Sequence, residues 1–280
     1  MRVGVVLPVA ASPSRERLLA VATAAEELGY DSVWANSHTA LPVHFKSRYP
    51  YSPDGRPGFK PDSRWADTLV SLGFVAAATD RVRLGTSVIP LINTDPLTLA
   101  KQAATVDLLS GGRLELGIGG GWLAEEGAVL GHPTDHRTSR MVETIEILRL
   151  AWSRPIFSFD GRYFQIPEVG VNPPPPQGPR LPIWIGGHGQ RVVEVCNQME
   201  ADLLLWLSDP EEVADFRRRL DPARQLAISM SLEPGESAWL DSASRLRDAG
   251  ADLLILARYF RREPVETLRR FAGEVLAKLA

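Results

Sequence analysis

Short apolar runs alternate with amphipathic segments along the whole chain. Runs rich in β-branched residues and too short for helices predict buried strands. The strand candidates are Arg2–Leu7, Ser32–Ala35, Val82–Ile89, Leu114–Gly119, Pro182–Gly186, Ala201–Leu207, Leu226–Leu232 and Ala251–Ala257. Helical patterns lie between them at Ser14–Leu28, Ala66–Thr79, Pro96–Leu109, His136–Trp152, Gln190–Gln198, Pro210–Leu220, Glu236–Ala249 and Pro264–Leu279. This alternation predicts an α/β fold with a parallel sheet.

The number of repeats favours a closed barrel. Eight strand–helix units in 280 residues match a (β/α)8 TIM barrel, which typically has about 250 residues. A doubly wound sheet is the alternative, but it would not require eight repeats. We expect a single domain over residues 1–280, with one insertion after strand 2 and a hairpin-containing insertion before strand 5.

Residues 82–122 show the pattern most clearly. The apolar run from Val82 reads as a strand, and Asp95 then offers an N-cap before Pro96, which suits a first helical turn. Gly111-Gly112 ends the helix, because glycine tolerates the left-handed conformation there. A second strand follows, so the stretch predicts parallel strands joined by a right-handed crossover.

A glycine cluster, 119–121, falls where the second of these strands ends. Ligands of parallel α/β folds bind at the carboxyl ends of strands, and glycines there let the backbone approach a large ligand. A tight turn without a ligand is the alternative. The cluster is no Rossmann fingerprint, because Trp122 stands where the third glycine would fall. In a similar run at Gly187-His188-Gly189, Val192 takes that place.

Two connections are longer than the others. Residues 36–65 follow strand 2 and combine five prolines with Tyr49, Tyr51 and Phe59, a composition suited to a lid over a substrate. A disordered excursion is the alternative. Residues 153–180 precede strand 5 and contain Asp160-Gly161, which favours a β-hairpin. We interpret this second insertion as a structural cover and assign it no chemistry.

Composition narrows the class of protein. Hydrophobic residues make up 44% and charged residues 23%, as in ordinary globular proteins. The net charge of −3, without a basic block, argues against a nucleic-acid partner. Cys196 is the only cysteine, which fits a reducing cytoplasm. No signal peptide or membrane-crossing stretch is seen, so we expect a cytoplasmic protein that does not bind membranes.

Four stretches in a fixed order carry a family resemblance: DSVWANSH (31–38), DRVRLGTSVIPL (80–91), LSGGRLELGIGGGW (109–122) and PIWIGGHG (182–189). With these, the chain resembles the luciferase-like monooxygenase superfamily over about three quarters of its length. Within it, the chain is similar to the actinobacterial branch predicted to use the deazaflavin coenzyme F-420. The motifs are less specific for the cofactor, because flavin and deazaflavin members share the barrel.

The resemblance implies a flavin-type ring across the carboxyl mouth of the barrel. It places a non-prolyl cis peptide at Ser87-Val88, against the ring. It implies that residues at the ends of two strands bind the ribityl chain and the phosphate of the cofactor. Together the cofactor-binding residues expected from it are Ser87, Val88, Gly120, Gly121, Trp122, Gly186, Gly187, His188 and Gly189. An empty glycine turn at the second strand end, just before a helix, is the alternative.

His38 is the candidate catalytic residue, because it follows strand 2 at the mouth, where the family often places an Asp-His pair. An imidazole there can bind the ring or exchange a proton near neutral pH. Ser37 replaces the expected aspartate, and a serine orients an imidazole only weakly. The expected substrate-binding residues are His44, Tyr49, Tyr51 and Phe59, and the aromatic ones favour an apolar or aromatic substrate.

The other polar residues point to structure. Glu125, Glu126, Arg137 and Arg140 match polar positions of the family, and we interpret them as an ion pair that clamps the glycine loop, with catalysis as the alternative. The histidines lack metal-ligand spacing, so no metal is expected.

Three functions are compatible with these residues. The preferred hypothesis is an oxidoreductase that uses coenzyme F-420 for hydride transfer to or from an organic substrate. The second is a monooxygenase that receives reduced FMN from a flavin reductase and activates oxygen. The third is a non-catalytic flavin- or deazaflavin-binding protein. The family resemblance also implies a homodimer.

Overall fold

Eight parallel strands close into a barrel in the computed structural model of the chain, which describes residues 1–206, 209–232, 238–259 and 263–279. The barrel strands are β1 Arg2–Val6, β3 Ser32–Ala35, β5 Arg83–Thr86, β7 Leu114–Gly119, β10 Ile183–Gly186, β11 Asp202–Leu205, β12 Leu226–Ser231 and β13 Leu253–Ala257. They are neighbours in chain order, and pairing of β13 with β1 and of β7 with β10 completes the ring. The predicted (β/α)8 barrel is confirmed.

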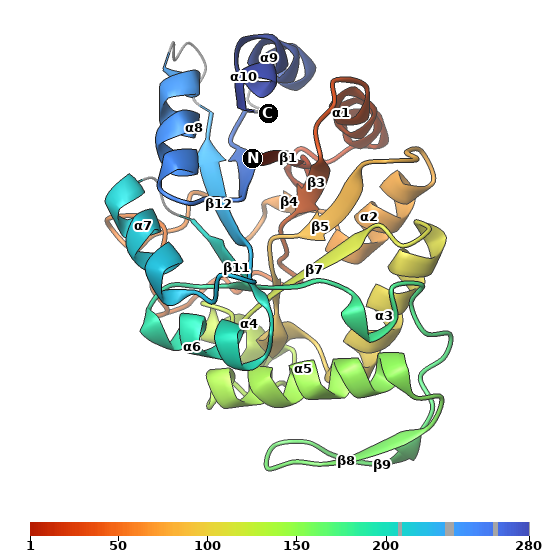
Figure 1. Cartoon of the computed structure of the whole chain (residues 1–280). Helices are drawn as coiled ribbons and strands as arrows, with labels where there is room; N and C mark the ends of the chain where they lie inside the picture. The colour runs from red at the N-terminus through yellow and green to blue at the C-terminus, as the bar shows by residue number, and fades with distance from the viewer. Residues whose placement is uncertain (207–208, 233–237, 260–262, 280) are drawn as a thin grey trace.

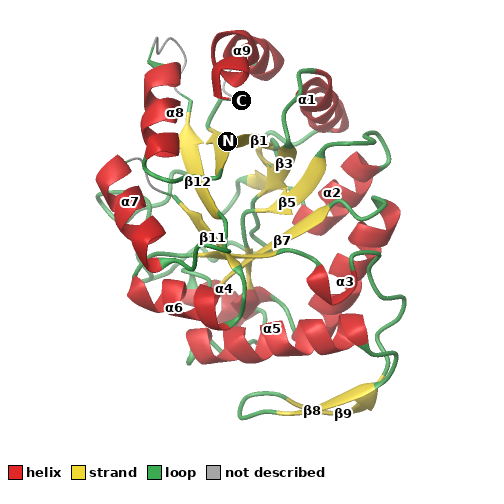
Figure 2. Cartoon of the chain, in the orientation of Figure 1, coloured by secondary structure: helices red, strands yellow, loops and turns green. Residues whose placement is uncertain are grey.

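Helices surround the strands on all sides (Figures 1 and 2). They are α1 Arg15–Glu27, α2 Thr68–Ala76, α3 Pro96–Leu109, α4 Ala124–Val129, α5 Arg137–Ser153, α6 Gln190–Gln198, α7 Pro210–Arg219, α8 Trp239–Asp248, α9 Pro264–Phe271 and α10 Ala277–Leu279, with a π-helical segment Ala272–Leu276 before the last. Short 3-10 turns cover Leu91–Asn93 and Gly178–Arg180. Leu207 and residues 236–237, at the ends of two predicted elements, lie outside the described residues.

The caps predicted for α3 are present. The Asp95 side chain accepts a hydrogen bond from the Thr98 N–H at 2.8 Å, and Pro96 occupies the first turn. Gly111 and Gly112 end the helix with φ of +69° and +84°, a conformation that glycine adopts without steric cost. Local sequence therefore determines both ends of this helix.

Two features differ from the sequence prediction. The expected strand Val82–Ile89 is divided into β5 and a two-residue strand β6, Ile89–Pro90, and the peptide bond Ser87-Val88 between them is cis, as the family resemblance implied. The helix α4 follows the glycine cluster, where we expected no helix. Its six residues are too few to show a helical pattern.

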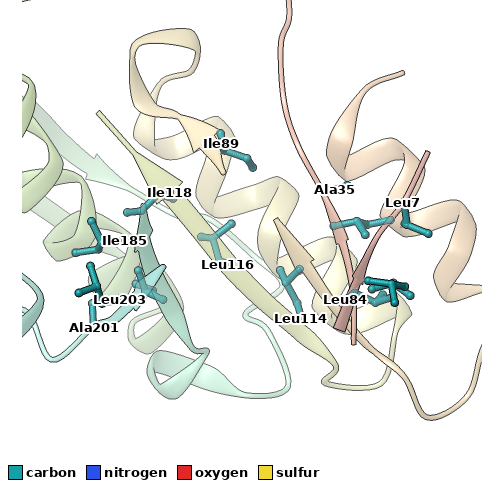
Figure 3. Packing of buried hydrophobic residues seen from close by; sticks show 14 of the residues in the cluster. Leu7, Ala35, Leu84, Ile89, Leu114, Leu116, Ile118, Ile185, Ala201 and Leu203 are labelled. Atoms are coloured by element: carbon teal, nitrogen blue, oxygen red, sulfur yellow. The ribbon is translucent and has the colours of Figure 1, made fainter. Parts of the chain in front are cut away.

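Apolar side chains form two layers, one inside the barrel and one between strands and helices. The inner cluster includes Trp34, Trp184, Ala227 and Ile255, and the rings of Trp34 and Trp184 meet edge-on at 5.8 Å. The outer cluster contains alternate residues of the same strands, such as those of β7 labelled in Figure 3. This alternation follows the two-residue period of a strand.

Both insertions are held by contacts with neighbouring elements. The 36–65 loop ends in β4 (Arg64–Trp65), which pairs with β2 (Ala10–Ala11). The second insertion forms the expected hairpin, β8 (Phe157–Asp160) and β9 (Gln165–Val169), set apart from the barrel beside α5 in Figure 1. Glu143 of α5 holds its turn by accepting hydrogen bonds from N–H groups of residues 162–164.

Candidate active site

His38 lies at the carboxyl mouth of the barrel, three residues after β3. Its side chain is only 7% exposed, and Nδ1 is 2.7 Å from Oε2 of Glu126, which is 1% exposed. An ionised carboxylate only accepts hydrogen bonds, so Nδ1 carries the proton and donates it. The Nε2 atom of His38 is then the atom that can take up a second proton.

Glu126 lies in α4 and binds the start of the 36–65 loop as well. Its Oε1 accepts hydrogen bonds from the N–H groups of Thr39 (2.6 Å) and Ala40 (3.0 Å). Burial by itself would raise the pKa of Glu126, but the hydrogen bond and charge of His38 and the two N–H donors outweigh it and lower the pKa. Glu126 therefore stays ionised at neutral pH.

This geometry corrects two interpretations made from the sequence. Although Ser37 replaces an aspartate, His38 has a carboxylate partner, which comes from 88 residues further along the chain. The expected ion pair between the glutamates and arginines is wrong. Arg137 instead donates to the carbonyl oxygen of Gly121 at 2.6 Å and so holds the glycine loop, while Arg140 pairs with Asp135 at 3.3 Å.

Aromatic side chains of the loop cover His38. Ring centroids of Trp65, Phe59 and Trp122 lie 4.8, 5.1 and 5.9 Å from that of His38. Tyr49 packs on Trp122 at 5.1 Å. The fold thus brings together Trp122, expected at the cofactor, with Tyr49 and Phe59, expected at the substrate, in one apolar roof over the histidine.

Of the other two expected substrate residues, Tyr51 continues this aromatic cluster, with its ring centroid 5.4 Å from that of Tyr49, whereas His44 lies apart from it. Tyr51 packs against His188 (5.3 Å) and against Trp206, which follows β11 (6.0 Å). Burial raises the pKa of Tyr51 to about 12, so its hydroxyl remains a hydrogen-bond donor at neutral pH. His44 is exposed and forms no hydrogen bond or ring contact with any residue that the structure describes.

The two glycine-rich strand ends are direct neighbours, because Gly119 of β7 pairs with Gly186 of β10. Val88 lies across both strands. A Cβ atom on Gly186 would come within 2.6 Å of Val88 Cγ1, and one on Gly119 within 2.9 Å of Cγ2. Part of the glycine requirement therefore comes from close packing of the chain on itself.

The rim is open at Gly120 and Gly189, whereas a Cβ atom on Gly121 would come within 2.6 Å of Ile92 Cδ1. A Cβ atom on Gly120 would meet only ordinary contacts, the nearest being Arg137 Cβ at 3.5 Å, and one on Gly189 would meet nothing within 4 Å. Gly189 is the N-cap of α6 and offers no side-chain acceptor to the N–H groups of the first turn. His188 stands beside them, and burial lowers its pKa in spite of the opposing charge of Glu212.

Two polar residues at the mouth were not expected from the sequence. The buried Oδ1 of Asn36, directly after β3, has no hydrogen-bond partner within the described residues. Arg258 follows β13 with a left-handed φ of +61°, which is uncommon for a residue with a side chain. Both directly follow predicted strands, a position that could have identified them. Cys196 is buried, and its raised pKa of about 12 makes it a poor nucleophile.

Comparisons with known proteins agree with this architecture. A sequence model described as luciferase-like monooxygenase matches residues 1–229. An uncharacterized protein of Mycobacterium bovis is 30% identical over 92% of this chain and 94% of its own length. An F420-dependent glucose-6-phosphate dehydrogenase of Kineococcus radiotolerans is 34% identical over 65% of this chain and 50% of its own.

Among solved structures, an F420-dependent secondary alcohol dehydrogenase, in complex with an F420-acetone adduct, superposes with a TM-score of 0.79. The superposition covers 99% of this chain and 98% of the dehydrogenase chain. The two sequences are 18% identical, so the likeness is one of fold alone. Within the described residues, no helix is long and apolar enough to span a membrane.

Proposed function

The chain belongs to the luciferase-like monooxygenase family of oxidoreductases, and from this premise we propose that it binds coenzyme F-420 and transfers hydride to or from an organic substrate. The observation that carries the proposal is the buried His38–Glu126 pair at the barrel mouth. The relatives named as F420-dependent support the choice of cofactor.

The residues at the mouth fit such a cofactor. The uncapped first turn of α6 and the open backbone at Gly120 and Gly189 suit a phosphate group and the chain attached to it. The unpartnered Oδ1 of Asn36 is an acceptor available to a ring N–H. When bound, the deazaflavin supplies the carbon that gives or accepts the hydride.

His38 moves the accompanying proton at Nε2. The charge of Glu126 stabilises the imidazolium form, and its hydrogen bond to Nδ1 fixes the orientation of the ring. Trp65, Phe59 and Trp122 cover the imidazole and restrict the access of water. These contacts suit a group that holds a proton next to a reacting centre.

The test is a His38→Ala variant compared with a His136→Ala control on the exposed surface of the chain. Titration with reduced F-420 should show the same affinity in both variants. Turnover with an identified substrate should fall by about 10²- to 10⁴-fold in His38→Ala alone, the usual contribution of a positioned acid or base. Unchanged turnover in His38→Ala would remove the assignment.

The same titration separates the other two hypotheses. Binding of reduced FMN, with oxygen consumption that requires a flavin reductase, would replace the proposal by a monooxygenase. Tight binding of F-420 without oxidation by any substrate of a panel would indicate a carrier protein. The cytoplasmic location, the homodimer and the absence of a metal remain predictions.

A further inference from the structure

A cavity of about 510 Å³ opens at the carboxyl ends of β11, β12 and β13. This is within the range of about 300–1,000 Å³ that is typical of small-molecule sites. The residues that line it include Tyr51, Trp206, Ser229, Ser231, Arg245 and Arg258. Tyr51 also contacts His188, so the cavity adjoins the expected cofactor-binding turn.

Two hydroxyl groups face this cavity from inside the barrel. Ala227 of β12 belongs to the inner cluster, and Ser229 and Ser231 follow it at the two-residue period of a strand. Within the described residues neither hydroxyl forms a hydrogen bond, so both are available to a ligand.

Arg258 stands beside Ser231, because Ala257, the residue before it, pairs with Ser231 in the sheet. The next residue, Tyr259, is buried, and its hydroxyl donates to the carbonyl oxygen of Val6 at 2.6 Å. Arg258 lies between β13 and the anchored Tyr259 and has a left-handed φ. Its guanidinium is 5.3 Å from the centre of the Trp206 ring.

The charge environment of Arg258 differs from that of the other arginine of the cavity. Arg258 forms no ion pair with the parts of the chain that the structure describes, whereas Arg245, on the same cavity, pairs with Asp241 at 2.9 Å. The acidic residues of the lining lie on the α7 wall. Asp209 caps that helix by accepting from the Glu211 N–H at 3.0 Å, and Glu212 is exposed on the first turn.

We propose that the organic substrate occupies this cavity and that Arg258 binds an anionic group of it, a carboxylate or a phosphate. Ser229 and Ser231 hydrogen-bond the polar atoms next to that group. A guanidinium presents paired N–H donors that match either anion. Tyr51 of the loop also lines this cavity, so the proposal adds an anionic group to the apolar or aromatic substrate expected from the sequence. That the ligand of this cavity is the substrate rests on the proposed function.

The test is calorimetric titration of the cofactor-free protein with phenyl phosphate, benzoate and the neutral benzyl alcohol. At least one of the two anions should bind about tenfold more tightly than the alcohol, since a hydrogen bond to a charged group is stronger than one to a neutral group. The anion that binds more tightly shows whether the site prefers a phosphate or a carboxylate group. Equal affinity for all three probes, or no binding of either anion, would overturn the proposal.

Variants assign the effect to one side chain. Arg258→Met should lower the anion affinity about tenfold and leave benzyl alcohol unchanged, and Arg258→Lys should retain part of the affinity. The control Arg269→Met, on α9 and outside the cavity, should stay within about twofold, because Arg269 forms an exposed ion pair with Glu266. Equal losses in both methionine variants would contradict the assignment. Because no cofactor is present, the outcome does not depend on whether the chain binds F-420.

Discussion

The carboxylate of Glu126 determines how His38 is held. Oε2 accepts the hydrogen bond from the imidazole Nδ1, while Oε1 accepts hydrogen bonds from the backbone N–H groups of Thr39 and Ala40. Both oxygens are thus occupied, and the side chain cannot rotate without losing a hydrogen bond. A buried charge arranged in this way positions a neighbouring acid–base group.

Replacing Glu126 should therefore reduce turnover through His38. Glu126→Gln keeps an acceptor for Nδ1–H but removes the charge, and we expect turnover to fall about 10- to 100-fold, as for loss of a charge-assisted hydrogen bond. Glu126→Ala should in addition change the imidazole tautomer, measured by ¹⁵N NMR of the cofactor-free protein. Glu146→Gln on the exposed face of α5 is the control. Wild-type turnover in both Glu126 variants would contradict this role.

Packing at Val88 gives a second prediction for a single residue. Gly186→Ala would place a Cβ atom 2.6 Å from Val88 Cγ1, so we expect it to lower the free energy of unfolding by about 1–3 kcal/mol. Gly73→Ala in α2, where nothing lies within 4 Å, should raise it by about 0.5–1 kcal/mol. Denaturant unfolding of both variants measures the difference. A stable Gly186→Ala variant would show that Val88 moves aside.

Among the elements, the short helix α4 holds the 36–65 loop over the site. Glu126 binds the start of the loop, and Oε1 of Glu125 accepts hydrogen bonds from the N–H groups of Lys46 (2.6 Å) and Ser47 (3.2 Å). Burial by itself would raise the pKa of Glu125, but the hydrogen bond of the Ser47 side chain and those of the backbone N–H groups outweigh it and lower the pKa to about 2.

The lowered pKa values predict how the loop responds to acid. An unfolded glutamate has a pKa of about 4.3. Because the folded values are lower, the stabilisation is present above about pH 5 and is lost as the pH falls toward the folded pKa. Hydrogen exchange at Lys46 and Ser47, corrected for intrinsic rates, should therefore accelerate on acidification.

Matched variants test whether the carboxylate is responsible. Glu125→Gln should show the faster exchange already at neutral pH. Glu26→Gln is the control, since Glu26 binds the N–H groups of Asp80, Arg81 and Val82 in a different loop. Slow exchange at Lys46 in Glu125→Gln would mean that other contacts hold the loop.

Across the whole molecule, the two ends of the barrel have different roles. The candidate site lies at the carboxyl end, whereas an ion network lies at the amino end. There Glu115 of β7, which is almost fully buried, pairs with Arg2 (3.0 Å) and with Arg83, and Arg2 also pairs with Asp31 (3.3 Å). In barrels of this kind, residues at the amino end serve stability and those at the carboxyl end serve catalysis.

Glu115→Ala should therefore destabilise the protein without affecting its chemistry. Removing the carboxylate leaves two arginines without their shared partner, and we expect a loss of about 1–3 kcal/mol, moderated because both arginines are partly exposed. Thermal unfolding measures the loss. The kcat and KM values measured below the melting temperature should equal those of the wild type. A changed KM would contradict the separation of the two ends.

Local sequence determined much of this protein. The period of the apolar residues predicted the barrel, and Asp95, Pro96 and the glycine pair predicted the ends of α3. These features depend on contacts within a few residues or on the alternation of faces along a strand. The predicted hairpin of β8 and β9 depends in the same way on the turn at Asp160-Gly161.

Only the tertiary structure decided the partners within the site. His38 and Glu126 are 88 residues apart, and the sequence neighbour Ser37 pointed to a weakly oriented imidazole. The same limit applies to Arg258 and Ser231, which line one cavity because β12 and β13 pair in register. Barrel closure brings distant strand ends to one mouth, so the chemistry there depends on long-range pairing that no local pattern encodes.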